Sequence, residues 1–314
     1  MRTVGLIGVG VVVAALVVWA VPSLGRPGSE PEALAKAPTN RTADASFGSY
    51  WFAGKAEVNR FELEQSRYGE LHPGHAMMIF VTEDFLPDRQ VKADDADRRR
   101  SGAWPVLKLN ATKSFNTGLY PYSLMTSTFT PIESDRHPRT LKSTTSVQEW
   151  CGHVFLQFNR KDDGYRARGL SYFQSEGDQD VSIEADWLED EVWNRIRLDP
   201  GSLPTGTFRM IPSGQFLRLR HRPLEAVSAR GTLSTDDDVQ IYRLEYPGEN
   251  RTLTIRFGAE FPHRIEGWEE VGVSGFGPNA KTLTTRATRT HTEMLDYWNH
   301  HDRSDTPLRA KLGL

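Results

Sequence analysis

The chain has 314 residues, of which 38% are hydrophobic and 25% charged, fractions close to globular averages, so it is not disordered as a whole. Its 38 basic and 41 acidic residues give a net charge of −3, without the basic excess typical of nucleic-acid binding proteins. The single cysteine excludes an intramolecular disulfide framework and an all-cysteine zinc site.

The N-terminus is the most apolar part of the chain. Thr3–Val21 carries no charge and follows the short head Met1-Arg2. A helix of about 20 residues matches the hydrocarbon thickness of a bilayer. The run is longer than the roughly 7–15 apolar residues of a signal peptide. Residues 1–25 are therefore predicted to form an uncleaved transmembrane anchor rather than a cleaved signal segment, with the rest of the chain exported.

Residues 26–46 are polar and rich in proline and alanine, which is typical of a flexible linker. The body, 47–314, has no composition break and is predicted to be one domain. Its apolar and polar residues alternate in short runs separated by turn residues, the pattern of β-strands. The predicted strands are 76–82, 106–110, 153–159, 168–175, 239–246, 252–257, 264–270 and 282–292. The last is polar on both faces, which favours an edge or solvated strand.

Helical patterns are scarce in the body. Asp186–Ile196 has apolar residues at helical spacing after an aspartate that can cap a helix, and Arg289–His300 is a second candidate. Many strands and one or two short helices predict a mostly β fold. We expect a large antiparallel curled sheet, a half-barrel or barrel, preceded by the transmembrane helix.

Several stretches resemble an uncharacterised family of bacterial envelope proteins, often lipoproteins, some of them labelled "septum formation inhibitor Maf". The similarity spans about residues 50–215, and its strongest segments are Leu63–Phe85, Ser114–Ile132 and Gln148–Asn159. It implies an exported, membrane-associated protein and no particular reaction. The chain lacks the lipidated cysteine of the lipoprotein members and the nucleotide-binding signature of Maf enzymes. The resemblance therefore places the expected body in the periplasm, or in the exported fraction if the N-terminus is cleaved.

The densest set of reactive side chains is Glu149, Cys151 and His153. On a strand these residues would share one face, and a thiolate beside an imidazole oriented by a carboxylate is the arrangement of a cysteine nucleophile. Same-face neighbours on one strand lie about 6–7 Å apart, which is long for direct proton transfer. Structural packing of the cysteine is therefore the competing interpretation.

Aromatic residues concentrate in the predicted strands. Most would fill the core of the sheet, but some could line an apolar cavity or groove, because curled sheets of this size often hold ligands. The candidate ligand-binding residues are Trp51, Tyr120, Tyr122, Trp150 and Tyr172. His72 and His75 flank a Pro-Gly turn, but two histidines alone make no closed metal site, so neither metal nor cofactor is expected.

These observations predict a non-enzymatic, membrane-anchored envelope protein that binds an apolar or lipid-like ligand or an envelope partner. The membrane contact would be made by the N-terminal helix, and no nucleic-acid partner is expected. The alternative is an envelope hydrolase or transferase that uses the Cys151–His153 pair.

Overall fold

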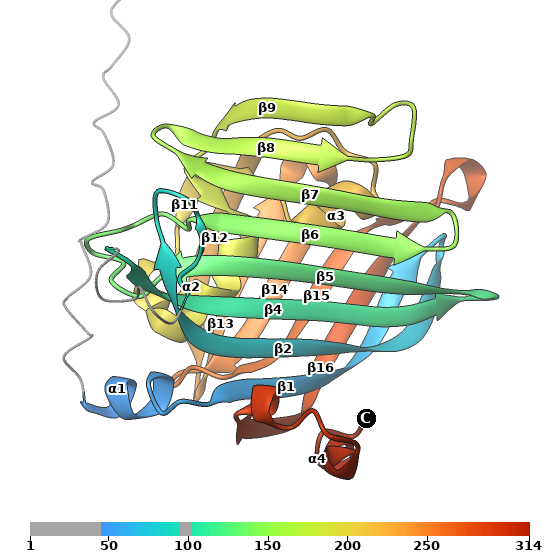
Figure 1. Cartoon of the computed structure of the whole chain (residues 1–314). Helices are drawn as coiled ribbons and strands as arrows, with labels where there is room; N and C mark the ends of the chain where they lie inside the picture. The colour runs from blue at the N-terminus through green and yellow to red at the C-terminus, as the bar shows by residue number, and fades with distance from the viewer. Residues whose placement is uncertain (1–44, 95–101) are drawn as a thin grey trace, which may run out of the picture. The chain divides into compact units, whose positions relative to one another are not determined.

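One large, mostly antiparallel sheet dominates the protein (Figure 1). The structure is a computed structural model that describes residues 45–94 and 102–314. Its 16-stranded sheet is not closed and confirms the predicted mostly β class. The strands are β1 Ala56–Arg67, β2 Glu70–Leu86, β3 Val91–Lys92, β4 Trp104–Thr117, β5 Tyr120–Pro131, β6 Lys142–Glu149, β7 Gly152–Lys161, β8 Gly164–Leu170, β9 Asp178–Glu184, β10 Trp187–Leu188, β11 Gly206–Ile211, β12 Val227–Asp236, β13 Val239–Tyr246, β14 Arg251–Gly258, β15 Ile265–Ser274 and β16 Lys281–Leu295.

Helices are short, as the sequence predicted. The α-helices are α1 Ala45–Trp51, α2 Val192–Leu198, α3 Gly214–Leu219 and α4 Leu308–Lys311. The 3₁₀ turns are η1 Glu189–Glu191, η2 Pro200–Ser202, η3 Pro247–Glu249, η4 Gly277–Asn279, η5 Tyr297–Asn299 and η6 Arg303–Asp305. The predicted helix over 186–196 is thus divided into η1 and α2 and starts three residues later.

The strand order explains the curl of the sheet. The order runs β10-β11-β12-β13-β14-β15-β16-β1-β2-β4-β5-β6-β7-β8-β9, so the late strand β16 pairs with the first strand β1. The two edges, β9 and β10, are consecutive in the chain and are separated only by Ala185 and Asp186. Such a link spans roughly 10 Å. The sheet must therefore bend until its two edges approach each other.

Two groups of buried side chains show how this bend is stabilised. The larger cluster joins residues of β1, β2 and β4 to α2 and to β13–β15, on the opposite wall. The second joins β7–β9 to β10, β11 and α3, and so ties the two edges together. Both clusters require residues from distant parts of the sequence, which is consistent with a single body rather than two domains.

The predicted strands were confirmed where the alternation was clear. Residues 239–246 form β13, and 252–257 lie within β14, with the predicted hairpin loop over 247–250. Residues 76–82 and 106–110 lie inside the longer β2 and β4. The strand predicted at 168–175 ends at Leu170, because Tyr172–Ser175 belongs to the loop before β9.

The end of the chain departs from two predictions. Residues 282–292 were expected to form an edge or solvated strand. β16 pairs with both β15 and β1, so it is not an edge strand, but it is solvated, because only Thr285 and Ala287 are buried. The helix predicted over Arg289–His300 is absent, because β16 continues to Leu295 and only the 3₁₀ turn η5 follows. β15 pairs with β16 only as far as Thr288, but pairing with β1 continues to Leu295 opposite Ala56. Pairing with β1 therefore prevails over the helical spacing of Met294, Leu295 and Trp298.

The predicted N-terminal segment, 1–25, and nearly all of the linker, 26–46, lie outside the described residues. Among the residues that are described, no helix is long and apolar enough to cross a membrane. The anchor and the periplasmic location remain predictions. The first described element is α1, which lies at the left-hand end of the sheet in Figure 1.

Candidate functional site

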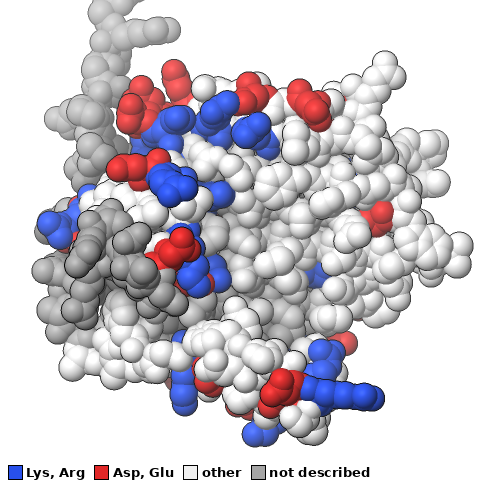
Figure 2. Space-filling model, viewed as in Figure 1, with Lys and Arg blue, Asp and Glu red and all other residues white. Residues whose placement is uncertain are grey.

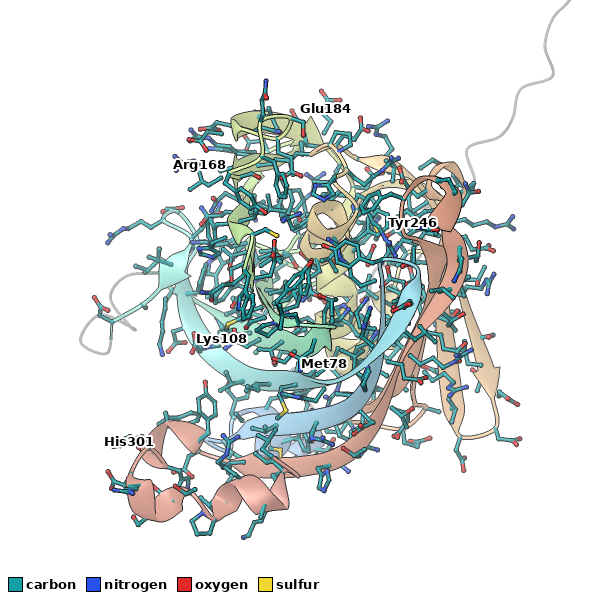
Figure 3. All side chains as sticks on the ribbon, turned by 90° about the vertical axis from the view of Figure 1, so that its right-hand side faces the viewer. Met78, Lys108, Arg168, Glu184, Tyr246 and His301 are labelled. Atoms are coloured by element: carbon teal, nitrogen blue, oxygen red, sulfur yellow. The ribbon has the colours of Figure 1, made fainter. Side chains whose placement is uncertain are left out.

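A cavity of about 290 Å³ lies on the concave side of the sheet. Its walls come from β1, β2, β4 and β5 on one side and β14–β16 on the other, with η1, α2 and α3 between them. Figure 3 looks along the sheet into this concave side, with Met78 of β2 and Tyr246 of β13 on different walls. Ligand pockets usually measure roughly 300–1,000 Å³, so the cavity suits a small ligand.

The segment formed by η1 and α2 crosses the interior and sets the shape of the cavity. The side-chain amide of Asn194 donates to the backbone oxygen of Leu107 and to the hydroxyl of Thr130, each at 3.0 Å. Ser143 donates to the carboxylate of Asp190 at 2.8 Å. These bonds fix the segment against β4, β5 and β6, so its acidic residues meet the cavity at defined positions.

A buried ion-pair network connects this segment to the opposite wall. Arg251 of β14 donates from Nη2 to Glu189 at 2.6 Å and from Nε to Glu270 at 2.7 Å. Tyr246 donates its hydroxyl to Glu189 at 2.7 Å. Burial opposes the charge on Arg251, but Glu189 and Glu270 outweigh it and raise the pKa of the guanidinium. Burial would likewise raise the pKa of Glu270, but Arg251 and then Lys113 lower it to about 2.

Two cations in the cavity wall have no ion pair with any described carboxylate. Lys113 of β4 places its Nζ 5.8 Å from the centre of the Trp268 ring, and burial lowers the pKa of its ammonium. Arg220, just after α3, also lines the cavity. Burial lowers the pKa of its guanidinium; the charge of Glu270 opposes this shift, and the nearby cations Arg67 and Arg251 add to it. Both side chains therefore offer hydrogen-bond donors and positive charge without a carboxylate in contact.

Unsatisfied polar atoms lie in the same wall. The side-chain oxygen of Gln65 and the hydroxyl of Thr128 are buried and have no hydrogen-bond partner, and both residues line the cavity. A buried polar atom without a partner costs free energy. A water molecule, or a ligand with polar groups, could form hydrogen bonds with both atoms. This part of the cavity is therefore suited to a polar headgroup.

The rest of the wall is apolar. Trp193 of α2 meets Trp268 of β15 edge to face, with ring centres 5.4 Å apart. Leu109 and Ala111 precede Lys113 on the same face of β4, and Phe216 of α3 adds a further ring. The cavity thus combines an aromatic and aliphatic wall with two unpaired cations.

Asp190 is the cavity residue whose charge changes near neutral pH. Burial raises the pKa of its carboxyl to about 6, and the charge of Glu189 acts in the same direction. Its hydrogen bonds from Ser143 and from the backbone of Gly214 only partly oppose this rise. The polarity of the cavity wall consequently depends on pH between about 5 and 7.

The predicted arrangement of Glu149, Cys151 and His153 on one strand face is wrong. Glu149 ends β6, Trp150 and Cys151 form the turn, and β7 begins at Gly152. Glu149 is buried, whereas Cys151 and His153 are exposed. The competing interpretation, structural packing of the cysteine, is also wrong, because the thiol is not buried. Side chains alternate between the two faces only within one strand. The two-residue turn between β6 and β7 reverses the chain, so alternation does not place Glu149, Cys151 and His153 on one face.

The structure brings Cys151 next to Glu149 instead. The backbone N–H of Cys151 donates to the Glu149 carboxylate at 2.6 Å, and Tyr172 donates to the same carboxylate at 3.3 Å. The hydrogen bond and charge of Glu149 raise the pKa of the Cys151 thiol. A raised pKa is the opposite of the activation that a cysteine nucleophile needs.

The predicted ligand-binding aromatics do not line the cavity. Trp51 is buried below the opposite end of the sheet, against Phe80. The other four gather at the right-hand end of the sheet in Figure 1, around the turns between strands: Tyr120, Tyr122, Trp150 and Tyr172. Tyr122 is buried there, while Trp150 and Tyr172 are exposed.

Sequence reasoning missed the residues that do line the cavity. For Lys113 a signal existed, because it follows Leu109 and Ala111 at two-residue intervals and so faces inward with them. Glu189 and Asp190 lie in the first turn of the predicted helix, where acidic residues are ordinarily solvated, yet both are buried. Glu189 pairs with Arg251 and Asp190 accepts a hydrogen bond from Ser143; both partners are distant in sequence, and no local pattern connects them.

Comparisons with known proteins add little. No protein-family model matches the chain, and no curated protein matches it. Among solved structures, the chain is similar to a porin-like protein from Bacteroides uniformis at 11% identity, with 76% of this chain and 96% of that chain covered. The TM-score is 0.19, too low to support any inference about fold or function. The function must be argued from the cavity itself.

Proposed function

We propose that the protein is a non-enzymatic binding protein of the bacterial cell envelope, and that its cavity holds a small amphiphile with an acidic headgroup. The observation that carries the proposal is the pairing of Lys113 and Arg220, without carboxylate partners, with an aromatic wall. Cations without carboxylate partners in a partly desolvated site favour carboxylates or phosphates. The apolar wall favours a hydrocarbon or aromatic tail.

The polar atoms of the cavity fit the same ligand. A carboxylic or phosphoric acid offers oxygens to Lys113 and Arg220, and a neighbouring hydroxyl or N–H of the ligand can donate to the side-chain oxygen of Gln65. The buried ion-pair network has a structural role: Arg251 already pairs with Glu189 and Glu270. These residues therefore hold the cavity wall in place and are not the groups that bind the acidic headgroup. The envelope location rests on the apolar N-terminal run and the family resemblance.

The test measures binding of radiolabelled dodecanoate to the full chain in lipid nanodiscs, with empty nanodiscs as background. We expect saturable binding of one dodecanoate per chain. Its methyl ester should bind at least about tenfold more weakly, equivalent to about 1.4 kcal/mol, because it lacks the negative charge. Binding no higher than in empty nanodiscs, or equal binding of acid and ester, would contradict the proposal.

A matched pair of variants locates the site. Lys113→Met removes the cation in the cavity and keeps a side chain of similar length, so dodecanoate affinity should fall about tenfold or more. Lys161→Met removes an exposed lysine that is the last residue of β7 and does not line the cavity, so it should leave affinity unchanged. A similar loss in both variants would indicate general charge attraction and not a cavity site.

A further inference from the structure

Exposed apolar side chains gather on the turns at one end of the sheet. We call this surface the rim and define it by five turns: Tyr68–Gly69, Gly118–Leu119, Trp150–Cys151, Tyr172–Phe173 and Phe276–Gly277. The exposed fractions are 83% for Leu119, 66% for Trp150 and 60% for Phe276. Single exposed apolar residues are ordinary, but such residues on five neighbouring turns indicate a contact surface.

Contacts between the turns make the rim continuous. The Tyr120 ring, beside Leu119, stacks on Trp150 with centres 6.1 Å apart. Tyr172 lies so close to Gly152 that a Cβ there would come within 2.4 Å of its ring. On the other side, the Tyr68 and Phe276 rings are 6.4 Å apart. The rim is therefore one surface formed by segments from β1 to β16.

The rim is poor in charge. Figure 2 shows few charged side chains over the right-hand end of the sheet, where these turns lie, and more over the β8–β9 edge. The exposed charged residues that flank the turns are Glu70, Asp178 and Lys281, whereas the flanking Arg67 and Glu149 are buried. Glu176 in the same loop region is paired with His221. The tips of the turns thus present mainly Leu, Trp, Tyr and Phe.

The rim borders the cavity, and cations lie beneath it. Phe276 is both exposed on the rim and part of the cavity wall. Arg67 donates to the Tyr122 hydroxyl and to the backbone of Leu219, immediately before Arg220. Neither Arg67 nor Arg220 has an ion pair with a carboxylate in the described part of the chain. Arg67 is buried and its donors are engaged by Tyr68, Tyr122 and Leu219, so Arg220 in the cavity wall is the cation that remains to meet an anionic group.

We infer that the rim docks onto the surface of a phospholipid bilayer that contains anionic lipids. Trp and Tyr favour the boundary between headgroups and acyl chains, where the ring is buried and its polar atom stays hydrated. Leu119 and Phe276 would enter the acyl region by a few ångström, and Arg220 would attract anionic headgroups. This contact is separate from the predicted N-terminal anchor, and it does not require the ligand proposed above.

The only cysteine provides a direct test, because Cys151 is exposed on the rim. The full chain is labelled there with an environment-sensitive fluorophore and reconstituted in vesicles of phosphatidylethanolamine and phosphatidylglycerol. Quenching by nitroxide-labelled lipid and by aqueous iodide is then measured. The control carries Cys151→Ser and Asp163→Cys, which moves the label to the turn at the opposite end of β7. Ten residues of strand separate the two labels by about 33 Å.

We expect lipid nitroxides to quench the label at position 151 and iodide to leave it largely unaffected, with the reverse for the label at 163. Leu119→Ser with Phe276→Ser should reduce lipid quenching several-fold, whereas Phe52→Ser, an exposed aromatic outside the rim, should not. Equal quenching at both positions would overturn the inference. Protection of position 151 from iodide without lipid quenching would overturn it too, because it would indicate a protein contact.

Discussion

Two groups of polar side chains in this protein differ in how closeness in sequence relates to closeness in the structure. Glu149, Cys151 and His153 are close in sequence, yet the structure distributes them over a turn with the thiol exposed. Lys113, Arg251 and Glu270 are far apart in sequence, yet they meet around one cavity. Sequence proximity of reactive residues is therefore a weaker guide to a site in this fold than the inward face of the curled sheet.

The largest expected effect is on the buried network. Arg251→Met would leave Glu189 and Glu270 buried without their partner, so the free energy of unfolding should fall by about 3–5 kcal/mol. Arg243→Met removes one arginine from a solvent-exposed pair with Glu245 and should cost less than about 1 kcal/mol. Urea unfolding of both variants measures the difference. A loss of similar size in the two variants would show that the cavity network does not stabilise the fold.

The second largest expected effect is that of Asp190 on the free energy of unfolding, and it depends on pH. Because the pKa of Asp190 is raised from 3.8 to about 6 in the folded state, the folded protein binds more protons than the unfolded chain between these values. Its contribution to stability is fully present below about pH 4 and is lost as the pH rises through 6. Asp190→Asn should therefore stabilise the protein by up to about 3 kcal/mol at pH 7.5 and change little at pH 4. Urea unfolding at both pH values measures this, and a pH-independent effect would contradict the assigned shift.

Glu270 makes the stability depend on pH in the opposite direction to Asp190. Arg251 and Lys113 lower the folded pKa of Glu270 to about 2, so its stabilising contribution is present above about pH 4.5 and is lost as the pH falls toward 2. Glu270→Gln should remove part of the acid sensitivity of unfolding between these values. The fraction folded, followed by circular dichroism from pH 5 to pH 2, is the measurement. An unchanged acid transition in Glu270→Gln would show that this pair does not control it.

The smallest effect concerns the thiol. Cys151 is exposed and should react with a maleimide, but more slowly than a free cysteine at pH 7, because Glu149 raises its pKa. Glu149→Gln should increase the rate several-fold, and His153→Gln should leave it unchanged. A rate above that of free cysteine, dependent on His153, would instead favour the Cys–His enzyme.

Much of the fold could be predicted, because alternation is a local property. β13, β14 and their loop were located from their alternating residues and turn-forming residues. The continuation of β16 to Leu295 could not be predicted, because the competing helical spacing of Met294, Leu295 and Trp298 is overcome only by pairing with the distant strand β1. The curl depends on the short link through Ala185 and Asp186, which has meaning only once the strand order is known.

The site was less predictable. Lys113 could have been found from its inward position after Leu109 and Ala111, whereas Arg220 lies in an irregular segment after α3 without any repeating pattern. The burial of Glu189 beside Arg251 depends on contacts across the whole interior. None of the five predicted ligand-binding aromatics lines the cavity. Four of them lie at one end of the sheet instead: Tyr120, Tyr122, Trp150 and Tyr172.

The most direct test of the central claim is native mass spectrometry of the full chain in nanodiscs made from its host membrane. If the cavity holds an acidic amphiphile, the wild-type chain should carry one small additional mass that solvent extraction removes. Lys113→Met should lose that mass, and Lys161→Met should retain it. Bare chain in all three proteins, or the same mass in Lys113→Met, would contradict the proposed cavity ligand.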